Sequence, residues 1–204
     1  MAVLGKPMVA HTLAALAGVA RLGRIVIVVA RDDTDFARRV TLPDPRFEVA
    51  GCGGTSRAAS VAGGLAELAR GGADAGDWVL VHDAARCLVR AAWIDDLIDA
   101  CRDDDVGGLL ACPVADTLKK EAGGRATTTV SRDRLWHAQT PQMFRLGVLA
   151  EALANAGDSV TDEAGAIEAI GLAPRLVEAP AENFKVTHGA DFAVAAAILQ
   201  ARRP

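Results

Sequence analysis

The sequence predicts a three-layer α/β/α, Rossmann-like fold with a mostly parallel sheet and a β-hairpin arm that projects from the body. Short apolar runs rich in Val and Ile, such as residues 24–30, alternate with stretches of helical periodicity, which is typical of buried parallel strands joined by helices. Apolar residues make up 51% of the sequence and aromatic residues only 4%, so aliphatic side chains must build the core. A chain of 204 residues usually forms one unit, and we expect a single domain over residues 1–204.

The front half of the chain is expected to begin with a helix and then to alternate strands and helices. Pro7 suits the first turn of a helix, and apolar residues recur at helical spacing from Val9 to Ala20. The later runs are either short and apolar, which favours a strand, or long and periodic, which favours a helix. They predict strands at residues 24–30 and in "RFEVAG", a helix at residues 57–69, a strand in "DWVLVHDAAR" and a helix carrying Trp93 to Cys101.

The back half contains a further buried strand in "VGGLLACPV" and then a polar hairpin over about residues 116–132. A turn at Gly123 and Gly124 joins two Thr-rich arms, and arms with so few apolar residues cannot form core. We expect the hairpin to project, with unpaired edges that favour pairing with a second chain. The elements expected beyond it are a helix at about Arg145 to Ala156, a helix starting near Thr161, a strand at about Arg175 to Glu178 and a C-terminal helix carrying Phe192, Ala195 and Leu199.

Composition and charge exclude several classes of protein. The net charge of −4 argues against a general nucleic-acid or acidic-membrane binder, because both need a basic surface. No run of about 18 apolar residues and no N-terminal signal peptide is present in the sequence, which favours a soluble cytoplasmic protein. The four cysteines lack CxxC spacing, so we expect buried, reduced thiols rather than disulfides or a zinc site.

The loops that follow the predicted strands carry the residues suited to chemistry. Ligands of layered α/β folds bind beyond the carboxyl ends of the strands, so we expect these loops to converge. Because the chain is acidic overall, any phosphate site among them must be locally basic. The loops are Gly51 to Ser60, Asp83 to Arg86, Asp116 with Thr117, and Asn183 to Thr187.

Two of these loops have a functional and a structural interpretation. The glycines ahead of Ser60 allow a ligand to approach the backbone, although turn conformation alone also explains them. Asp83 and Arg86 directly follow an apolar strand, where a Mg²⁺ ion and a phosphorylated ligand could meet, because carboxylates suit the cation and guanidinium groups suit phosphate. A helix cap and an ion pair explain the same two residues equally well.

Other polar residues have plainer interpretations. His82 is expected to pack at the end of its strand rather than to act as a catalyst. Asp162 and Glu163 fall in a first helical turn, where carboxylates cap a helix and stabilise its dipole. Each of three more residues is either a surface charge or turn residue, or part of a functional site. The choice depends on which other polar residues the fold brings beside them; the three are Arg132, Thr140 and Lys185.

Seven blocks, in order along nearly the whole chain, resemble the 2-C-methyl-D-erythritol 4-phosphate cytidylyltransferases of non-mevalonate isoprenoid synthesis. They are "GKPMVAHTL", "GGTSRAASV", "DWVLVHDAAR", "DTLK", "LWHAQTPQ", "VTDEA" and "NFKVT". The resemblance implies a homodimer that transfers CMP from CTP to the methylerythritol phosphate, with Mg²⁺ as cofactor and pyrophosphate as leaving group. Two alternatives stay open: an enzyme that uses ribitol 5-phosphate, and a non-catalytic nucleotide-binding or dimerisation protein.

The resemblance also implies a role for particular residues. The nucleotide would be bound by Gly54, Ser60, Asp83, Ala84 and Lys185. The acceptor would be bound by Arg86, Thr117, Arg132 and Thr140. Asp83 would also bind the metal, while Arg132 and Lys185 would act as catalytic residues that orient the attacking phosphate, with Arg132 reaching the partner subunit's site. Thr55 stands where many relatives have Asp, which departs from the family pattern.

A larger departure lies at the front of the sequence. The family pattern opens with a buried strand, a glycine-rich loop that contains a catalytic Arg, and a catalytic Lys. This sequence has no counterpart of them, because Lys6 in "LGKP" matches a later position of the family. We therefore expect the 204 residues by themselves to be nearly inactive and reduced in stability.

Overall fold

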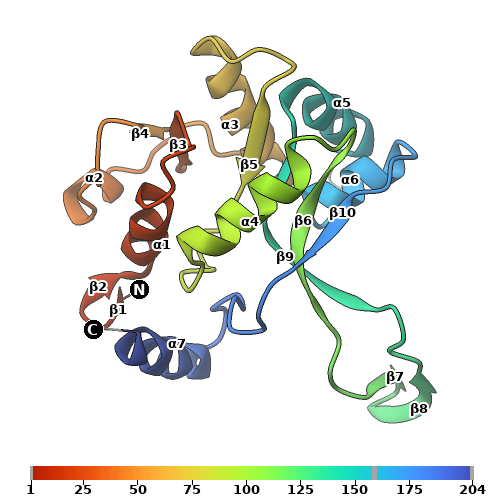
Figure 1. The fold of residues 1–204 in the computed structure, drawn as a ribbon. Helices are drawn as coiled ribbons and strands as arrows, with labels where there is room; N and C mark the ends of the chain where they lie inside the picture. The colour runs from red at the N-terminus through yellow and green to blue at the C-terminus, as the bar shows by residue number, and fades with distance from the viewer. Residues whose placement is uncertain (1, 158–159, 203–204) are drawn as a thin grey trace.

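A computed structural model describes residues 2–157 and 160–202 as an α/β fold, so the predicted domain limits at 1 and 204 lie outside the described residues (Figure 1). The first elements are β1 (Ala2–Val3) and β2 (Lys6–Pro7), which pair antiparallel, followed by α1 (Met8–Ala17). The expectation that a helix comes first was wrong. Gly5 turns the chain at φ 78°, and Pro7 ends β2 with an extended ψ of 134° before the helix begins.

The main sheet has four strands in the order β10, β6, β9, β5. They are β5 (Trp78–Val81), β6 (Gly107–Pro113), β9 (Trp136–Arg145) and β10 (Arg175–Glu178). Strands β6 and β10 run parallel, whereas β9 runs antiparallel to both of its neighbours. Three strands therefore point the same way and β9 opposes them, so the sheet is mixed and a mostly parallel sheet is not shown.

Two further strands form a separate parallel pair, β3 (Ile25–Val28) with β4 (Phe47–Ala50). A short helix between them, α2 (Phe36–Arg39), was not predicted. The pair is not hydrogen-bonded to the main sheet within the described part of the chain.

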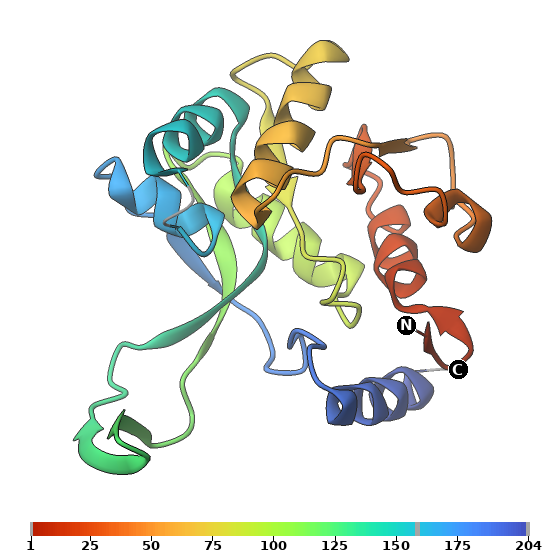
Figure 2. The same ribbon diagram turned by 180° about the vertical axis from the view of Figure 1, so that it is seen from behind.

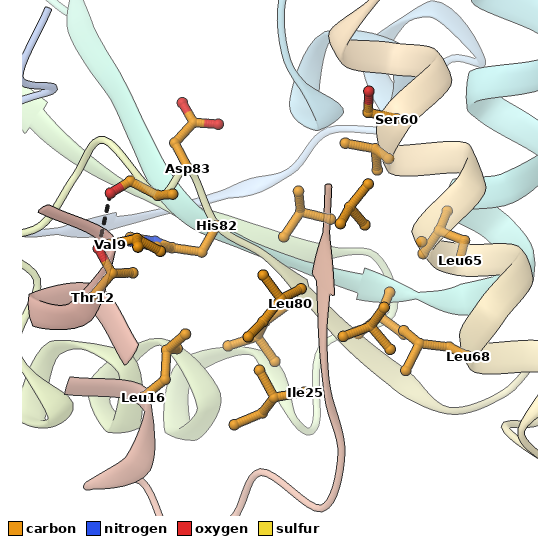
Figure 3. A pocket seen from close by; sticks show the side chains of 18 of the residues that line it. Val9, Thr12, Leu16, Ile25, Ser60, Leu65, Leu68, Leu80, His82 and Asp83 are labelled. Carbon is orange, nitrogen blue, oxygen red and sulfur yellow. Dashed lines mark hydrogen bonds between the residues drawn. The ribbon is translucent and has the colours of Figure 1, made fainter. Parts of the chain in front are cut away.

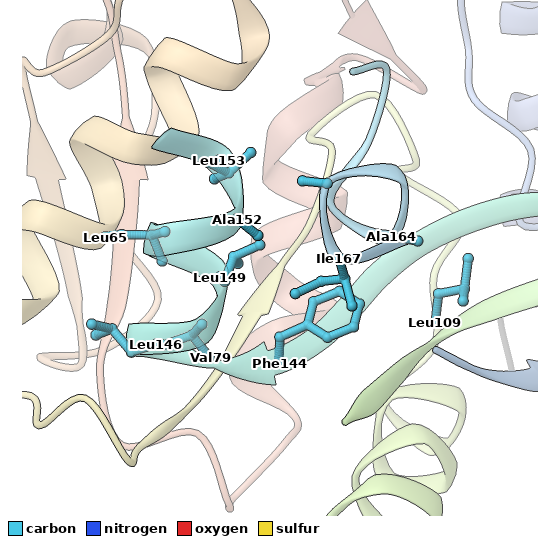
Figure 4. Packing of buried hydrophobic residues seen from close by; sticks show 11 residues of the cluster. Leu65, Val79, Leu109, Phe144, Leu146, Leu149, Ala152, Leu153, Ala164 and Ile167 are labelled. Atoms are coloured by element: carbon cyan, nitrogen blue, oxygen red, sulfur yellow. The ribbon is translucent and has the colours of Figure 1, made fainter. Parts of the chain in front are cut away.

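Helices cover both faces of the main sheet (Figures 1 and 2). The covering helices are α3 (Arg57–Arg70), α4 (Ala91–Cys101), α5 (Leu146–Ala156) and α6 (Glu163–Ala169), whereas α7 (Gly189–Ala201) lies away from the main sheet and contacts β1. Alternation along β9 sends Phe144 toward α5 and α6, where it packs with Leu149, and sends Met143 toward α4, where it packs with Leu97 (Figure 4). The α/β architecture and these helix positions confirm the periodicity analysis.

The hairpin arm is β7 (Leu118–Ala122) paired with β8 (Arg125–Val130). Gly123 and Gly124 turn the chain at φ 60° and 77°, the left-handed conformation that a two-residue hairpin turn requires. Figures 1 and 2 show the arm standing away from the body at the end of the extensions of β6 and β9. The prediction of a projecting hairpin is confirmed, and most of its side chains are exposed.

The cysteines are all free thiols; Cys87 and Cys101 are buried, whereas Cys52 and Cys112 are partly exposed. The prediction of reduced thiols is confirmed, and burial is confirmed for two of the four. None of the helices described within residues 2–157 and 160–202 has the length and apolar character needed to cross a membrane.

Candidate active site

A cavity of about 210 Å³ opens where the loop after β5 meets β9 and the loop before α7. Three of the predicted loops and strand ends contribute to it, as expected for an α/β fold. Charged and polar side chains dominate the lining, including Arg57, Asp83, Arg86, Thr140, Gln142 and Lys185.

Asp83 lies at the centre of this cavity and is held from three sides. Its Oδ1 accepts a hydrogen bond from Arg57 Nε at 3.0 Å, and its Oδ2 pairs with Lys185 Nζ at 2.9 Å. Its backbone N–H donates to Thr140 Oγ1 at 3.0 Å. Burial alone would raise the pKa of Asp83, but Lys185 and Arg57 together hold that pKa below its ordinary value. The carboxylate is therefore ionised at neutral pH.

Arg86 forms the wall of the cavity opposite the helices. Its Nη1 donates to the carbonyl oxygen of Asn183 at 2.8 Å and its Nη2 donates to that of Ala138 at 3.1 Å. These bonds fix the guanidinium between the loop before α7 and strand β9. Its Nε is buried and has no hydrogen-bond partner among the described residues. An acceptor oxygen in the cavity would satisfy this donor.

His82 packs under the cavity, as the sequence predicted for a strand-end residue. Its Nδ1 lies 3.2 Å from Thr140 Oγ1 and its Nε2 lies 3.3 Å from the carbonyl oxygen of Arg86. Removal from solvent lowers the pKa of His82 to about 4. The ring is therefore neutral at pH 7, and we infer that Nε2 carries the proton, because a carbonyl oxygen can only accept.

The glycine-rich loop is packed tightly against the start of α3. Gly54 N–H donates to Ser60 Oγ at 3.0 Å, and that hydroxyl donates to the carbonyl oxygen of Ser56 at 2.9 Å. A Cβ atom on Gly54 would lie 2.5 Å from the Cβ of Ala59, so only glycine fits there. Close packing against Ala59 explains Gly54, whereas the structural interpretation of this stretch was turn conformation, and Gly54 does not have a positive φ.

A second cavity, of about 300 Å³, lies between β3 and β5. Its depth is apolar, with Leu16, Ile25 and Leu80 from three elements, and Ser60 and Asp83 stand at its polar end (Figure 3). Arg57, Asp83 and Ala84 also line it. Because Arg57 and Asp83 line both cavities, they form the boundary between them.

The structure brings together most, but not all, of the predicted site residues. Asp83, Arg86, Thr140 and Lys185 meet in the polar cavity. Thr140 is a buried residue of β9 rather than a turn residue. The remaining predicted acceptor residues, Thr117 and Arg132, are exposed at the base of the hairpin arm and line neither cavity.

Sequence reasoning missed the pair formed by Arg57 and Glu163. Arg57 Nη1 and Nη2 donate to the two carboxylate oxygens of Glu163 at 2.6 and 2.9 Å, and Glu163 is fully buried. The helix-cap prediction is confirmed for Asp162, which accepts from Gly165 N–H at 3.0 Å. It does not account for Glu163. A signal was available, because a cation at the first residue of a helix opposes the helix dipole.

A divalent cation has one candidate carboxylate here. Among the described residues, no three His, Cys, Asp or Glu side chains gather into a metal-binding cluster. Mg²⁺ in nucleotide-processing sites usually takes one or two carboxylates and completes its shell with phosphates and water. Asp83 fits that mode of binding, on the condition that Lys185 or Arg57 yields one of its oxygens.

Comparisons with known proteins agree with one another. The sequence pattern of 2-C-methyl-D-erythritol 4-phosphate cytidylyltransferase matches residues 1–201. The enzyme of that name from Laribacter hongkongensis is 54% identical over 96% of this chain and 84% of its own length. The bifunctional enzyme IspD/IspF of Albidiferax ferrireducens is 60% identical over 97% of this chain, which spans only 47% of that relative.

Solved structures lead to the same family. A crystal structure of 4-diphosphocytidyl-2C-methyl-D-erythritol synthase has a TM-score of 0.90 and 39% identity, covering 98% of this chain and 92% of that one. The 2-C-methyl-D-erythritol 4-phosphate cytidylyltransferase of Francisella tularensis has a TM-score of 0.84 and 30% identity, covering 96% and 89%.

Fold, charged cavity and relatives together define a nucleotidyltransferase, specifically an enzyme of the cytidylyltransferase class. The resemblance first noted in seven short blocks extends over nearly the whole chain. The chain belongs to the 2-C-methyl-D-erythritol 4-phosphate cytidylyltransferase family of the non-mevalonate route to isoprenoids.

Proposed function

We propose that this chain transfers CMP from CTP to 2-C-methyl-D-erythritol 4-phosphate in the cytoplasm, releasing pyrophosphate and forming 4-diphosphocytidyl-2-C-methyl-D-erythritol. The observation that supports this most is the meeting of Arg86, Thr140 and Lys185 beside an ionised Asp83 in one cavity. The two cations suit an anionic acceptor, and the Thr140 hydroxyl holds the backbone of Asp83 beside them. The carboxylate suits a metal ion that carries the nucleotide phosphates.

The reaction joins two anions, so the site must offset their repulsion. An oxygen of the acceptor phosphate bonds to the α-phosphorus of CTP, the bond to the bridging oxygen of the β-phosphate breaks, and pyrophosphate leaves with that electron pair. Lys185 holds and orients the attacking phosphate. Arg86 binds the acceptor through its buried Nε donor. Mg²⁺ held by Asp83 would supply charge neutralisation on the nucleotide phosphates.

The nucleotide is proposed to bind at the polar end of the second cavity only, because its apolar depth between β3 and β5 is the space that an added strand would fill. Ser60 and Ala84 stand there with Asp83, and Gly54 packs the loop onto α3 behind them. We propose that the cytidine lies on one side of Asp83 and the acceptor on the other. Asp83 then lies where the α-phosphate and the attacking phosphate meet.

The hairpin arm is proposed to complete the site of a second copy of the chain, giving a homodimer. Thr117 and Arg132 lie at its base, away from the cavity of their own chain. Unpaired edges of a projecting hairpin favour contact with another chain. In the dimer, Arg132 of each chain would reach the acceptor phosphate bound by its partner.

We also infer that residues 1–204 belong to one domain, whose sheet is completed by a further strand between β3 and β5. Each of these strands is paired on one side, to β4 and β9, and both line the cavity that separates them. The side chains Ile25–Val28 of β3 are only partly buried, although such a continuous apolar run is typical of a strand buried on both faces. An added strand would join the two sheets into one.

The acceptor decides between this proposal and its closest alternative. Pyrophosphate release should be followed with CTP and Mg²⁺ for a chain extended ahead of Met1 by the strand, the glycine-rich loop with Arg and the Lys of the family pattern, offering 2-C-methyl-D-erythritol 4-phosphate or ribitol 5-phosphate at equal concentrations. Faster release with the methylerythritol phosphate supports the proposal, and faster release with ribitol 5-phosphate favours the alternative enzyme. Binding of CTP without release from either acceptor would favour a non-catalytic nucleotide-binding protein.

A further inference from the structure

Arg57 and Glu163 connect the first residue of α3 to the first residue of α6 through an ion pair whose carboxylate is fully buried and whose arginine side chain is 32% exposed. Two parallel hydrogen bonds, of 2.6 and 2.9 Å, join the guanidinium to the carboxylate. Such a two-point contact fixes both the position and the plane of the guanidinium. Glu163 has no exposed surface, so solvent does not compete for it.

The same guanidinium directs its remaining edge at Asp83. Its Nε donates to Asp83 Oδ1 at 3.0 Å, while Lys185 holds Oδ2 at 2.9 Å. The two cations differ in freedom. Arg57 is planar and clamped at its other edge, whereas Lys185 has a flexible side chain that is 43% exposed. Arg57 is therefore the fixed partner of Asp83, and Lys185 is the partner that a metal ion can replace.

Strand β9 anchors both ends of this arrangement. Thr140 accepts from the backbone N–H of Asp83 at 3.0 Å. Two positions along the strand, Gln142 donates to Asp162 at 2.9 Å and accepts from a backbone N–H in the first turn of α6 at 2.7 Å. These bonds hold the start of α6, and with it Glu163. The backbone and the carboxylate of Asp83 are thus both positioned from β9.

Stability does not explain why Arg57 occupies its position. A cation at the first residue of α3 faces the positive end of the helix dipole. Taking Arg57 and Glu163 out of water also carries a desolvation cost that their attraction often does not exceed. A buried pair with these costs is better explained by the orientation it imposes on a neighbour.

We propose that Glu163 and Arg57 are positioning residues for cytidylyl transfer: Glu163 clamps Arg57, and Arg57 fixes the carboxylate of Asp83 at the boundary between the nucleotide and acceptor cavities. The role in transfer rests on the proposed function. Arg57 occupies one carboxylate oxygen of Asp83 and leaves the other to Lys185. An incoming metal ion can displace Lys185 from that second oxygen. Lys185 is then free to turn toward phosphate. Neither Arg57 nor Glu163 needs to touch the reacting atoms.

The test uses Glu163→Gln, which keeps the size of the side chain but presents an amide N–H₂ to one guanidinium N–H group and so breaks the two-point contact. Calorimetry with CTP in excess Mg²⁺ is expected to show binding about 10–100-fold weaker, as for other residues that orient a metal ligand. The NMR signal of the Arg57 Nε–H is expected to exchange slowly in the unaltered chain and faster in Glu163→Gln. Glu163→Asp keeps the charge but shortens the reach, and is expected to behave like Glu163→Gln.

Asp44→Asn provides a matched control. Asp44 also makes a two-point contact, with Arg46 at 3.0 and 2.7 Å, but lines neither cavity. The Asp44→Asn substitution should lower the free energy of unfolding without changing the affinity for CTP. The proposal is overturned if Glu163→Gln binds CTP as the unaltered chain does, or if Glu163→Asp restores affinity. All variants are made in a chain extended ahead of Met1 by the strand, glycine-rich loop and Lys of the family pattern. If that chain without substitutions binds no CTP, the proposed function fails, and the Arg57 signal still decides whether Glu163 acts as the clamp.

Discussion

Thr140 accepts a hydrogen bond from the backbone N–H of Asp83 at 3.0 Å, although 57 positions separate them in the sequence. Thr140 is 3% exposed and lies in β9, whereas Asp83 follows β5. The same hydroxyl lies 3.2 Å from Nδ1 of His82, so it can accept from one residue and donate to the next. One buried hydroxyl thereby fixes the loop that carries the proposed metal ligand.

Replacing this hydroxyl should destabilise the fold. Thr140→Val keeps the shape but leaves the Asp83 N–H without its acceptor, which commonly costs about 1–3 kcal/mol when the group is buried. Urea unfolding should show the loss. Thr128→Val, on the exposed face of the hairpin arm, is the matched control and should change stability by less than about 0.5 kcal/mol. Equal effects of the two substitutions would show that the Thr140 bond contributes nothing.

His82 should make stability depend on pH. Its pKa is about 4 in the folded chain against 6.5 for the free group, so the unfolded chain binds the proton more readily. The free energy of unfolding should therefore fall as the pH falls from about 6.5 to about 4, by at most about 3 kcal/mol. His82→Asn does not titrate, so its pH profile should be flatter in this window. Parallel profiles for the two chains would contradict a neutral, partly buried His82.

A chain extended ahead of Met1 by a strand, a glycine-rich loop with Arg, and a Lys should gain stability and activity together. The strand would pair with the edges of β3 and β5, and the loop would supply cations and amide groups to the CTP phosphates. Removing one such donor commonly costs about 10²–10³ in rate, so the 204-residue chain should be at least that much slower. Thermal unfolding and pyrophosphate release measure both effects. Equal turnover by the two chains would make the added loop dispensable.

Lys185 should matter for rate and little for stability. The Lys185 side chain is 43% exposed in its pair with Asp83, and pairs with an exposed partner contribute less than about 1 kcal/mol to folding. Lys185→Met in the extended chain should lower kcat by about 10²–10³, because it removes a cation that orients the attacking phosphate. Lys6→Met, an exposed lysine in β2, is the control and should leave kcat unchanged. A purely structural Lys185 would lower the unfolding temperature and spare kcat.

Arg132 should act across the dimer. In extended chains, Arg132→Ala and Lys185→Ala should each be inactive alone. When they are mixed and allowed to exchange subunits, half of the dimers are mixed and each contains one intact site, so activity should return to about a quarter of the unaltered level. No recovery, or only monomers by light scattering at micromolar concentration, would mean that Arg132 does not serve a partner's site.

The predictability of the fold varied with the kind of residue in each element. Apolar periodicity located α3, α5 and β10 to within one or two residues, because their side chains pack by hydrophobicity alone. Apolar periodicity failed for β9, where Gln139 and Gln142 are buried yet polar. Gln139 finds its partner in the loop after β10, and Gln142 finds its partner in the first turn of α6. A pattern of apolar residues cannot reveal a strand whose buried side chains are satisfied by hydrogen bonds.

The candidate site shows the same division. Asp83, Arg86 and Lys185 were found because loops after strands converge, and motif resemblance added Thr140. The clamp between Arg57 and Glu163 was missed, because its two residues are 106 positions apart and each is compatible with an ordinary helix start. The unfavourable position of the Arg57 cation, at the positive end of the α3 dipole, was visible in the sequence. Only the structure identified the carboxylate that resolves this conflict.

Phosphorus NMR of the extended chain with CTP, Mg²⁺ and 2-C-methyl-D-erythritol 4-phosphate tests the central claim most directly. The signals of CTP and of the acceptor phosphate should decline together, while a diphosphate diester and pyrophosphate appear in equal amounts. UTP in place of CTP should give much slower change. Loss of CTP without consumption of the acceptor phosphate, or no change beyond a protein-free sample, would contradict cytidylyl transfer as the function of this chain.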